Sequence, residues 1–154
     1  MLTRDWTLRS LLASLLFVAA SCPAAVQNLG VLFWHDSPND QAALAGLREG
    51  LRATGRPFEL IVLRADSDPT RAAAHVAEFR RRGVDLIVAL GTEAARVASV
   101  RSEGLPVVFT AVTDPVSSGI VPSWKGSGSF VAGNSNHIDP HRVARLVNGA
   151  RLRR

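Results

Sequence analysis

Short apolar runs alternate along this chain with longer segments in which apolar residues recur every three or four positions. Each run has the length of a β-strand, and each longer segment has the periodicity of an amphipathic helix. The runs cover residues 29–34, 58–63, 86–90 and 107–112. Strands that alternate with helices at this spacing form βαβ units, so the pattern predicts an α/β fold with helices on both faces of a parallel sheet.

The run Leu86–Leu90 is the centre of the predicted sheet, because its five residues are all apolar and glycines lie on both sides of it. That pattern is typical of a strand that is buried on both faces. Gly91 allows a tight turn after the strand, and Thr92 is expected to cap the next helix with its hydroxyl. Right-handed crossovers then favour a three-layer, doubly wound parallel sheet in the strand order 2-1-3-4.

Local signals predict where the helices begin and end. The first helix is expected to be capped by Asn39 or Asp40 and to end at Gly55. Asp68 is expected to cap the second helix, with Pro69 at the first helical position, where a proline loses no hydrogen bond. The apolar spacing predicts that this second helix, over residues 70–82, buries Ala73, Val76, Ala77 and Phe79 or Arg80.

The pattern changes after the fourth run. Residues 117–129 are rich in Gly, Ser and Pro without periodicity, which predicts a long surface segment. Residues 130–133 are a candidate fifth strand. Asp139 and Pro140 are expected to start a final helix, and no strand follows it before Arg154. The chain is therefore expected to stop within a βαβ unit.

The N-terminal residues have the three parts of a secretory signal peptide. Arg4 and Arg9 precede the apolar run 11–20, and small residues follow it. The run is shorter than a typical membrane span. Residues 1–25 are therefore predicted to direct export, to the periplasm or to the outer face of the cytoplasmic membrane.

The only cysteine of the chain, Cys22, lies at the end of the predicted signal peptide. A single cysteine excludes an internal disulfide. Its position resembles that of the lipidated cysteine in a bacterial lipobox, although Pro23 follows it. Two processing routes stay open: lipidation at Cys22, and simple cleavage after Ala24 or Ala25.

Charge and motifs exclude several classes of function. The formal charge of +5 comes from 18 basic and 13 acidic residues, but no predicted helix has a basic face interleaved with aromatic residues, so nucleic acid is not an expected partner. The histidines are dispersed, and neither a dinucleotide fingerprint nor a Walker lysine is present, so no metal and no cofactor is predicted. No nucleophile with an orienting partner lies near His35 or Asp36, so the sequence predicts no catalytic residue and no enzyme.

Polar residues follow three of the predicted strands at their carboxyl ends, which meet at one edge of a parallel sheet. There the Trp34 ring would stack on a flat ligand, Thr92 and nearby helix N–H groups would hold a carboxylate, and Asp114 would accept from an ammonium group. An amino acid offers all three groups. Each residue also has a simpler alternative role: Trp34 in packing, Thr92 in capping and Asp114 in a turn. The candidate ligand-binding residues are Trp34, His35, Asp36, Ser37, Gly91, Thr92, Glu93, Thr113 and Asp114.

Four motifs in this order resemble a known family. The segments VDLIVALGT at 84–92, LPVVFTAVTDPVSSGIV at 105–121 and VAGNS at 131–135 look like the first lobe of bacterial ABC transporter substrate-binding proteins of the tryptophan/tyrosine-uptake type. The segment GLREGLRATG at 46–55 resembles the first helix of that family. The resemblance covers residues 29–147.

This resemblance implies a type I periplasmic-binding-protein fold, in which two α/β lobes close on a small solute and deliver it to an ABC permease in the membrane. Residues 26–133 would form the first lobe, and residues 134–154 would be the start of a truncated second lobe. The binding residues of the family would map to 34–37, to 91–93, and to Thr113 and Asp114. The chain is thus expected to be an extracytoplasmic solute-binding component, with two alternatives: a truncated fragment that does not bind, and a single-lobe ligand-sensing or interaction domain.

Overall fold

The computed structural model describes residues 27–126, 128–136 and 144–145. The described residues form one five-stranded sheet in the order β2-β1-β3-β4-β5, and all neighbouring strands are parallel. The predicted doubly wound order 2-1-3-4 is therefore confirmed, and β5 extends it. The elements are β1 (Gln27–Phe33), α2 (Pro38–Ala53), β2 (Phe58–Arg64), α3 (Pro69–Arg81), β3 (Leu86–Leu90), α4 (Thr92–Arg101), β4 (Val107–Val112) and β5 (Val131–Ser135).

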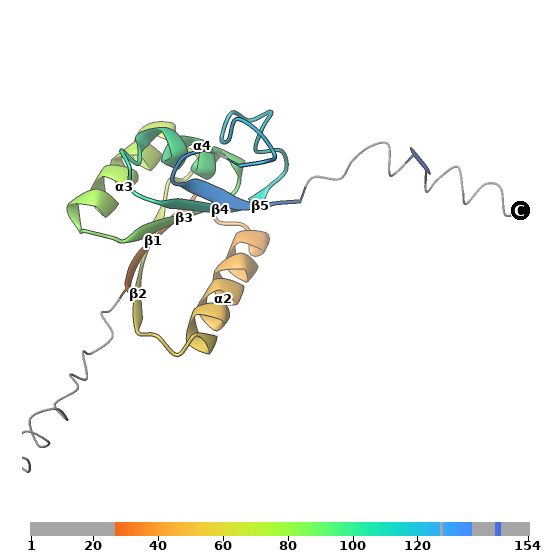
Figure 1. Cartoon of the computed structure of the whole chain (residues 1–154). Coiled ribbons are helices and arrows are strands. Elements are labelled where there is room, and N and C mark those ends of the chain that lie inside the picture. The colour runs from red at the N-terminus through yellow and green to blue at the C-terminus, as the bar shows by residue number, and fades with distance from the viewer. Residues whose placement is uncertain (1–26, 127, 137–143, 146–154) are drawn as a thin grey trace, which may run out of the picture.

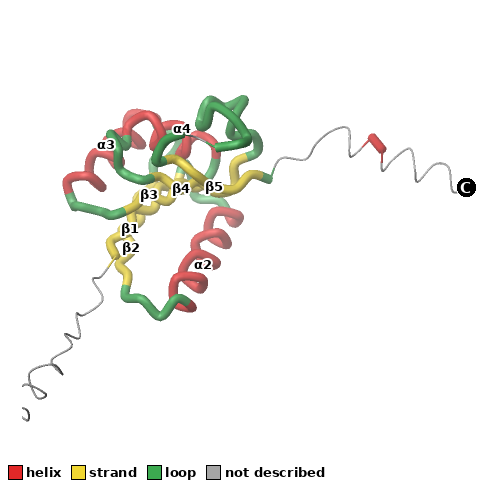
Figure 2. Tube along the Cα trace, viewed as in Figure 1, coloured by secondary structure: helices red, strands yellow, loops and turns green. Residues whose placement is uncertain are grey.

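The sheet is the middle one of three layers (Figure 1). Helices α3 and α4 cover one face of the sheet, and α2 lies on the other face (Figure 2). Residues of β3 alternate between two core clusters, because successive side chains of a strand point to opposite faces. Ile87 and Ala89 belong to the cluster that includes Phe79 of α3. Val88 and Leu90 belong to the cluster on the α2 side, so β3 is buried on both faces, as predicted.

The close packing of α3 on β1 depends on Gly30. A β-carbon at Gly30 would lie 2.7 Å from the ring of Phe79, and the Phe79 side chain is fully buried. Real β-carbons essentially never come within 3.0 Å of such a neighbour. Glycine inside a strand often marks a close approach of this kind. The glycine in the first apolar run is therefore a packing requirement of the core.

The first helix begins earlier than predicted. Ser37 is the N-cap of α2, in place of Asn39 or Asp40, and Pro38 opens the first turn. The Asp40 N–H donates a hydrogen bond to the Ser37 hydroxyl oxygen at 3.1 Å. A serine followed by a proline is a strong start signal, since the proline φ is already helical and its missing N–H would have no partner there.

The start of α3 is as predicted, with Asp68 as the N-cap and Pro69 after it. The predicted buried side of α3 is partly wrong, because Ala77 is exposed and Ala73 is only half-buried. The ring of Phe79 faces β1. Val76 and Ala72, three and seven positions before it, lie on the same side of the helix, and Ala77 lies on the exposed side. The buried residues of α3 are Ala72, Val76 and Phe79.

The connection from β4 to β5 is better packed than its composition suggests. Most of residues 117–129 are exposed, but Ile120 and Val121 are buried in the core. The fifth strand covers Val131–Ser135 in place of the expected 130–133, because Phe130 lies before the strand and is exposed. This connection therefore contributes to the core as well as to the surface.

The predicted signal peptide, residues 1–25, and Cys22 within it lie outside the described residues. The predicted final helix also lies outside them, apart from Ala144 and Arg145, which are helical. None of the described helices has the length and apolar character needed to cross a lipid bilayer.

Candidate functional site

The carboxyl-terminal ends of β1, β3 and β4 lie side by side at one edge of the sheet. In the parallel register Phe33 pairs with Leu90, and Leu90 pairs with Thr110. The Gly91 N–H donates to the Thr110 carbonyl at 3.0 Å, which continues the pairing beyond β3. The structure therefore brings the predicted site residues to one edge in three groups, 34–37, 91–93 and 113–114. We call this the strand-end edge.

Trp34, directly after β1, is half-buried and packs against the core on the α3 side. Its carbonyl accepts a hydrogen bond from the Ser67 N–H at 2.8 Å, which joins the exit of β1 to the turn before α3. The packing role that the sequence left open is therefore present. Only the exposed part of the ring is left as a surface on which a flat ligand would stack.

The next three residues are held by contacts with β2 and with the start of α2. Asp36 forms an ion pair with Arg64 at the end of β2, with 3.6 Å between the carboxylate and Nε. The Ser37 hydroxyl donates to the Asp40 carboxylate at 2.7 Å, and His35 Nε2 lies 4.0 Å from the same oxygen. Asp40 is only 7% exposed, whereas 58% of the His35 side chain is exposed. The loop therefore has a defined shape and presents the imidazole at the edge.

The turn after β3 differs from the prediction in its cap. Gly91, with φ of +88°, is the N-cap of α4, and Thr92 is the first helical residue, so the Thr92 hydroxyl is not the cap. Glycine is needed at this φ, as expected. Within the part of the chain that the structure describes, no side chain caps α4, so the N–H groups of its first turn have no capping oxygen. Glu93 in this turn accepts from Arg96 Nε at 3.0 Å.

Asp114 turns the chain after β4. Its carboxylate accepts hydrogen bonds from the Val116 N–H at 3.1 Å, the Ser117 N–H at 3.0 Å and the Ser117 hydroxyl at 2.8 Å. The alternative role as a turn residue is therefore present. Thr113 is exposed, and its carbonyl accepts from the Ser135 hydroxyl at 2.7 Å, which joins the exits of β4 and β5.

The charges at the strand-end edge suit a small polar ligand. The edge carries the carboxylates of Asp36, Glu93 and Asp114 and the imidazole of His35. Carboxylates attract a cationic group, and the N-terminus of α4 attracts an anionic group. Across the described ranges, no three His, Cys, Asp or Glu residues gather into a possible metal site. The edge therefore offers chemical partners for groups of both charge signs.

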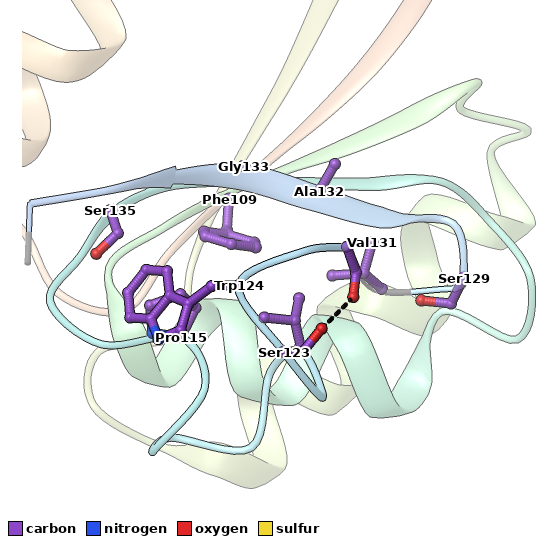
Figure 3. Close-up of a pocket in the computed structure, with 11 residues that line it drawn as sticks. Phe109, Pro115, Ser123, Trp124, Ser129, Val131, Ala132, Gly133 and Ser135 are labelled. Atoms are coloured by element: carbon purple, nitrogen blue, oxygen red, sulfur yellow. Dashed lines mark hydrogen bonds between the residues drawn. The ribbon is translucent and has the colours of Figure 1, made fainter.

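Sequence reasoning missed a cavity beside β5, of about 550 Å³ (Figure 3). The cavity lies between the edge of the sheet and the connection that leads from β4 to β5. The one sequence signal was Trp124, an aromatic residue within a segment rich in Gly and Ser, and this residue is 58% exposed. We call it the β5 cavity; its lining residues are Phe109, Pro115, Val121, Ser123, Trp124, Gly126, Ser129, Val131, Ala132, Gly133 and Ser135.

Comparison with known proteins gives consistent matches. The family model described as ABC transporter substrate binding protein matches residues 28–148. The tyrosine-binding protein of Clostridioides difficile strain R20291 is 27% identical over 125 residues, which are 79% of this chain and 36% of that protein. The resemblance found in the sequence motifs is therefore confirmed.

Two solved structures are similar in both sequence and fold. A conserved domain protein from Vibrio cholerae is 27% identical, with a TM-score of 0.72, over 80% of this chain and 43% of that one. An ABC domain from Streptococcus pneumonia in complex with L-Trp is 27% identical, with a TM-score of 0.69, over 73% of this chain and 39% of that one. The chain thus spans between 36% and 43% of the length of these relatives.

Proposed function

Because this chain belongs to the family of ABC transporter substrate-binding proteins, we propose that it binds a small, amino-acid-like solute at the strand-end edge. Two similar proteins support an amino acid: one is a tyrosine-binding protein, and the other was solved in complex with L-Trp. An amino acid carries a carboxylate, an ammonium group and a side chain. The strand-end edge offers a chemical partner for each of them.

The observation that carries this proposal is the start of α4. Gly91 turns the chain so that the N–H groups of the first turn of α4 lie at the strand-end edge, and no described side chain caps them. Such N–H groups, together with the helix dipole, favour an anionic oxygen. The solute carboxylate would bind there, and the Thr92 hydroxyl would donate a further hydrogen bond to it.

The ammonium group and the side chain of the solute would be held by the neighbouring loops. Asp114 and Asp36 lie on either side of the β3 exit, and their negative charges would attract the ammonium group. The exposed part of the Trp34 ring and the His35 imidazole would contact an aromatic solute side chain. Ligand binding would therefore use all three groups of the strand-end edge.

We expect binding without a catalytic step. The family is one of substrate-binding proteins, and neighbouring groups fix the carboxylates of the strand-end edge in place while they attract the ammonium group: Asp36 pairs with Arg64, Glu93 accepts from Arg96, and Asp114 holds its own turn. Catalysis by a general base would require a side chain placed within hydrogen-bond reach of a reacting proton. This arrangement suits a site that holds a solute and releases it unchanged, with no cofactor.

The place of the chain in transport is also part of this proposal. Residues 1–25 would direct export, and either lipidation at Cys22 or simple cleavage would leave the mature protein outside the cytoplasm. Residues 26–133 would be the first lobe, and residues 134–154 would be the start of a truncated second lobe. An ABC permease in the membrane would be the protein partner.

A thermal melt of the chain with a panel of amino acids tests the proposal. A ligand that binds only the folded state raises stability by about 2.7 kcal/mol at a concentration of 100 Kd. We expect an aromatic amino acid to raise the midpoint and a neutral sugar of similar size to leave it unchanged. A cooperative melt that no amino acid shifts would contradict binding. The absence of a cooperative melt would support the alternative of a truncated fragment.

A further inference from the structure

We propose that the β5 cavity is a second binding site and that it takes a small, neutral aromatic molecule. None of the residues predicted for the strand-end edge lines this cavity. It lies on the α4 side of the sheet, where Phe109, Val121 and Val131 belong to the core cluster of that face. Its volume of about 550 Å³ is within the range of about 300 to 1,000 Å³ that is typical of small-molecule sites.

One wall of the cavity is fixed by the contact between β5 and Phe109. A β-carbon at Gly133 would lie 2.2 Å from the Phe109 carbonyl oxygen and 2.5 Å from its ring. Strand β5 therefore passes so close to Phe109 that only glycine fits there. Phe109 is 3% exposed, so its position is set by the fold before any ligand arrives, and only a small part of it faces the cavity. A preformed wall lowers the ordering cost of binding.

The opposite side of the cavity carries apolar surface that a ligand would cover. Figure 3 shows Trp124 and Pro115 grouped with Phe109 around the cavity. Pro115 is buried, whereas Trp124 is 58% exposed. A planar ligand lying against the exposed indole would remove this apolar area from water and make its aromatic contact with Trp124.

The lining selects against charge. Within the described part of the chain, no acidic or basic side chain lines the cavity; its polar groups are backbone groups, the Trp124 indole N–H and the hydroxyls of Ser123, Ser129 and Ser135. The Ser123 hydroxyl is itself used within the wall, since it donates to the Gly126 carbonyl at 3.2 Å (Figure 3). An ion would lose its hydration here without gaining a counter-charge. A neutral ring is therefore favoured over a zwitterionic amino acid.

An NMR titration of the full chain with indole and, separately, with L-tryptophan tests this proposal. The two probes share one ring system and differ in the charged groups. We expect indole to shift the Trp124 side-chain N–H and the amides of Ser129 and Val131 in a saturable way, and L-tryptophan to leave these signals unchanged. Nuclear Overhauser contacts between indole and the Phe109 ring give a readout that needs no variant.

A matched pair of variants locates the site. Trp124→Ala is expected to weaken indole binding at least about tenfold, because it removes one aromatic wall. Phe130→Ala is the control, since it removes a nearby ring that is 70% exposed and does not line the cavity. Equal losses in both variants, shifts that never saturate, or L-tryptophan binding in the cavity as tightly as indole would each overturn the proposal. Shifts confined to residues 91–93 with L-tryptophan concern the proposed function alone, so the two proposals succeed or fail separately.

Discussion

Ser37 and Asp40 bind each other in both directions at the start of α2. The Ser37 hydroxyl donates to the Asp40 carboxylate at 2.7 Å, and the Asp40 N–H donates to the Ser37 hydroxyl oxygen at 3.1 Å. This arrangement is similar to a capping box, in which two groups at a helix start satisfy each other. Because the same carboxylate lies near His35, the cap of α2 also shapes one loop of the strand-end edge.

Replacing this serine is expected to destabilise the fold. Ser37→Ala should lower the free energy of unfolding by about 1 kcal/mol, since it removes the N-cap hydroxyl. Urea denaturation measures the change. The control is Ser99→Ala within α4, where the hydroxyl donates only to the Arg96 carbonyl of its own helix, and alanine is the better helix former. A loss of stability at Ser99 as large as that at Ser37 would contradict the capping role.

Two glycine substitutions should have opposite effects. Gly30→Ala places a β-carbon 2.7 Å from the Phe79 ring, and overpacking of this kind costs about 1 to 3 kcal/mol. Gly46→Ala in α2 meets no atom within 4 Å and should stabilise the helix by up to about 1 kcal/mol. Urea midpoints of the two variants measure the difference. An unchanged urea midpoint for Gly30→Ala would contradict the close contact between Gly30 of β1 and the Phe79 ring of α3.

Thr92→Val tests the strand-end edge as a ligand site. Valine has nearly the same shape but no hydroxyl, and a lost hydrogen bond to a charged group costs about 1.5 to 3 kcal/mol. We therefore expect affinity for the amino acid to fall about tenfold or more, with little change in the melt of the free chain. Calorimetric titration measures this. Thr54→Val, after the far end of α2, is the control, and unchanged affinity in Thr92→Val would remove Thr92 from the site.

The stability of the fold should depend on pH through the carboxyl group of Glu78. Hydrogen bonds from Arg81 and then Arg82 lower the pKa of its carboxyl from about 4.5 to about 2. A lowered pKa in the folded state means that Glu78 stabilises the fold above pH 4.5 and that this contribution disappears as the pH falls towards 2. Urea midpoints between pH 2 and pH 6 should therefore vary less in Glu78→Gln than in the wild type. The exposed Glu49 of α2 supplies the comparison, as Glu49→Gln; the same flattening in that variant would show that Glu78 has no special part in the pH dependence.

The order of the elements could be predicted from the sequence because it depends on local patterns. The apolar residues of Leu86–Leu90 predicted a doubly buried strand, and the signals at Asp68 and Pro69 predicted the start of α3. Both are short-range effects of burial and backbone geometry. The parallel order followed from the alternation of strands and helices with right-handed crossovers. Because all strands are parallel, the same order also places the carboxyl ends of β1, β3 and β4 at one edge of the sheet.

The details of the edge depended on competition between neighbouring signals. Ser37, Asn39 and Asp40 are all good N-cap residues, and the structure uses Ser37. Thr92 is also a good cap, but Gly91 takes that place because the chain needs a positive φ directly after β3. Sequence alone ranks such candidates equally, since the choice depends on where the strand ends in its sheet register.

The sequence by itself thus determined the alternating α/β order and the residues that reach the strand-end edge, because periodicity and turn chemistry are local properties. Only the tertiary structure decided how those residues are used. It packs Trp34 partly into the core, and it uses the Asp114 carboxylate to stabilise a turn. It also forms the β5 cavity, where Gly133 passes against Phe109, 24 positions earlier in the chain. Such contacts join residues that are distant in sequence, and only packing in three dimensions brings them together.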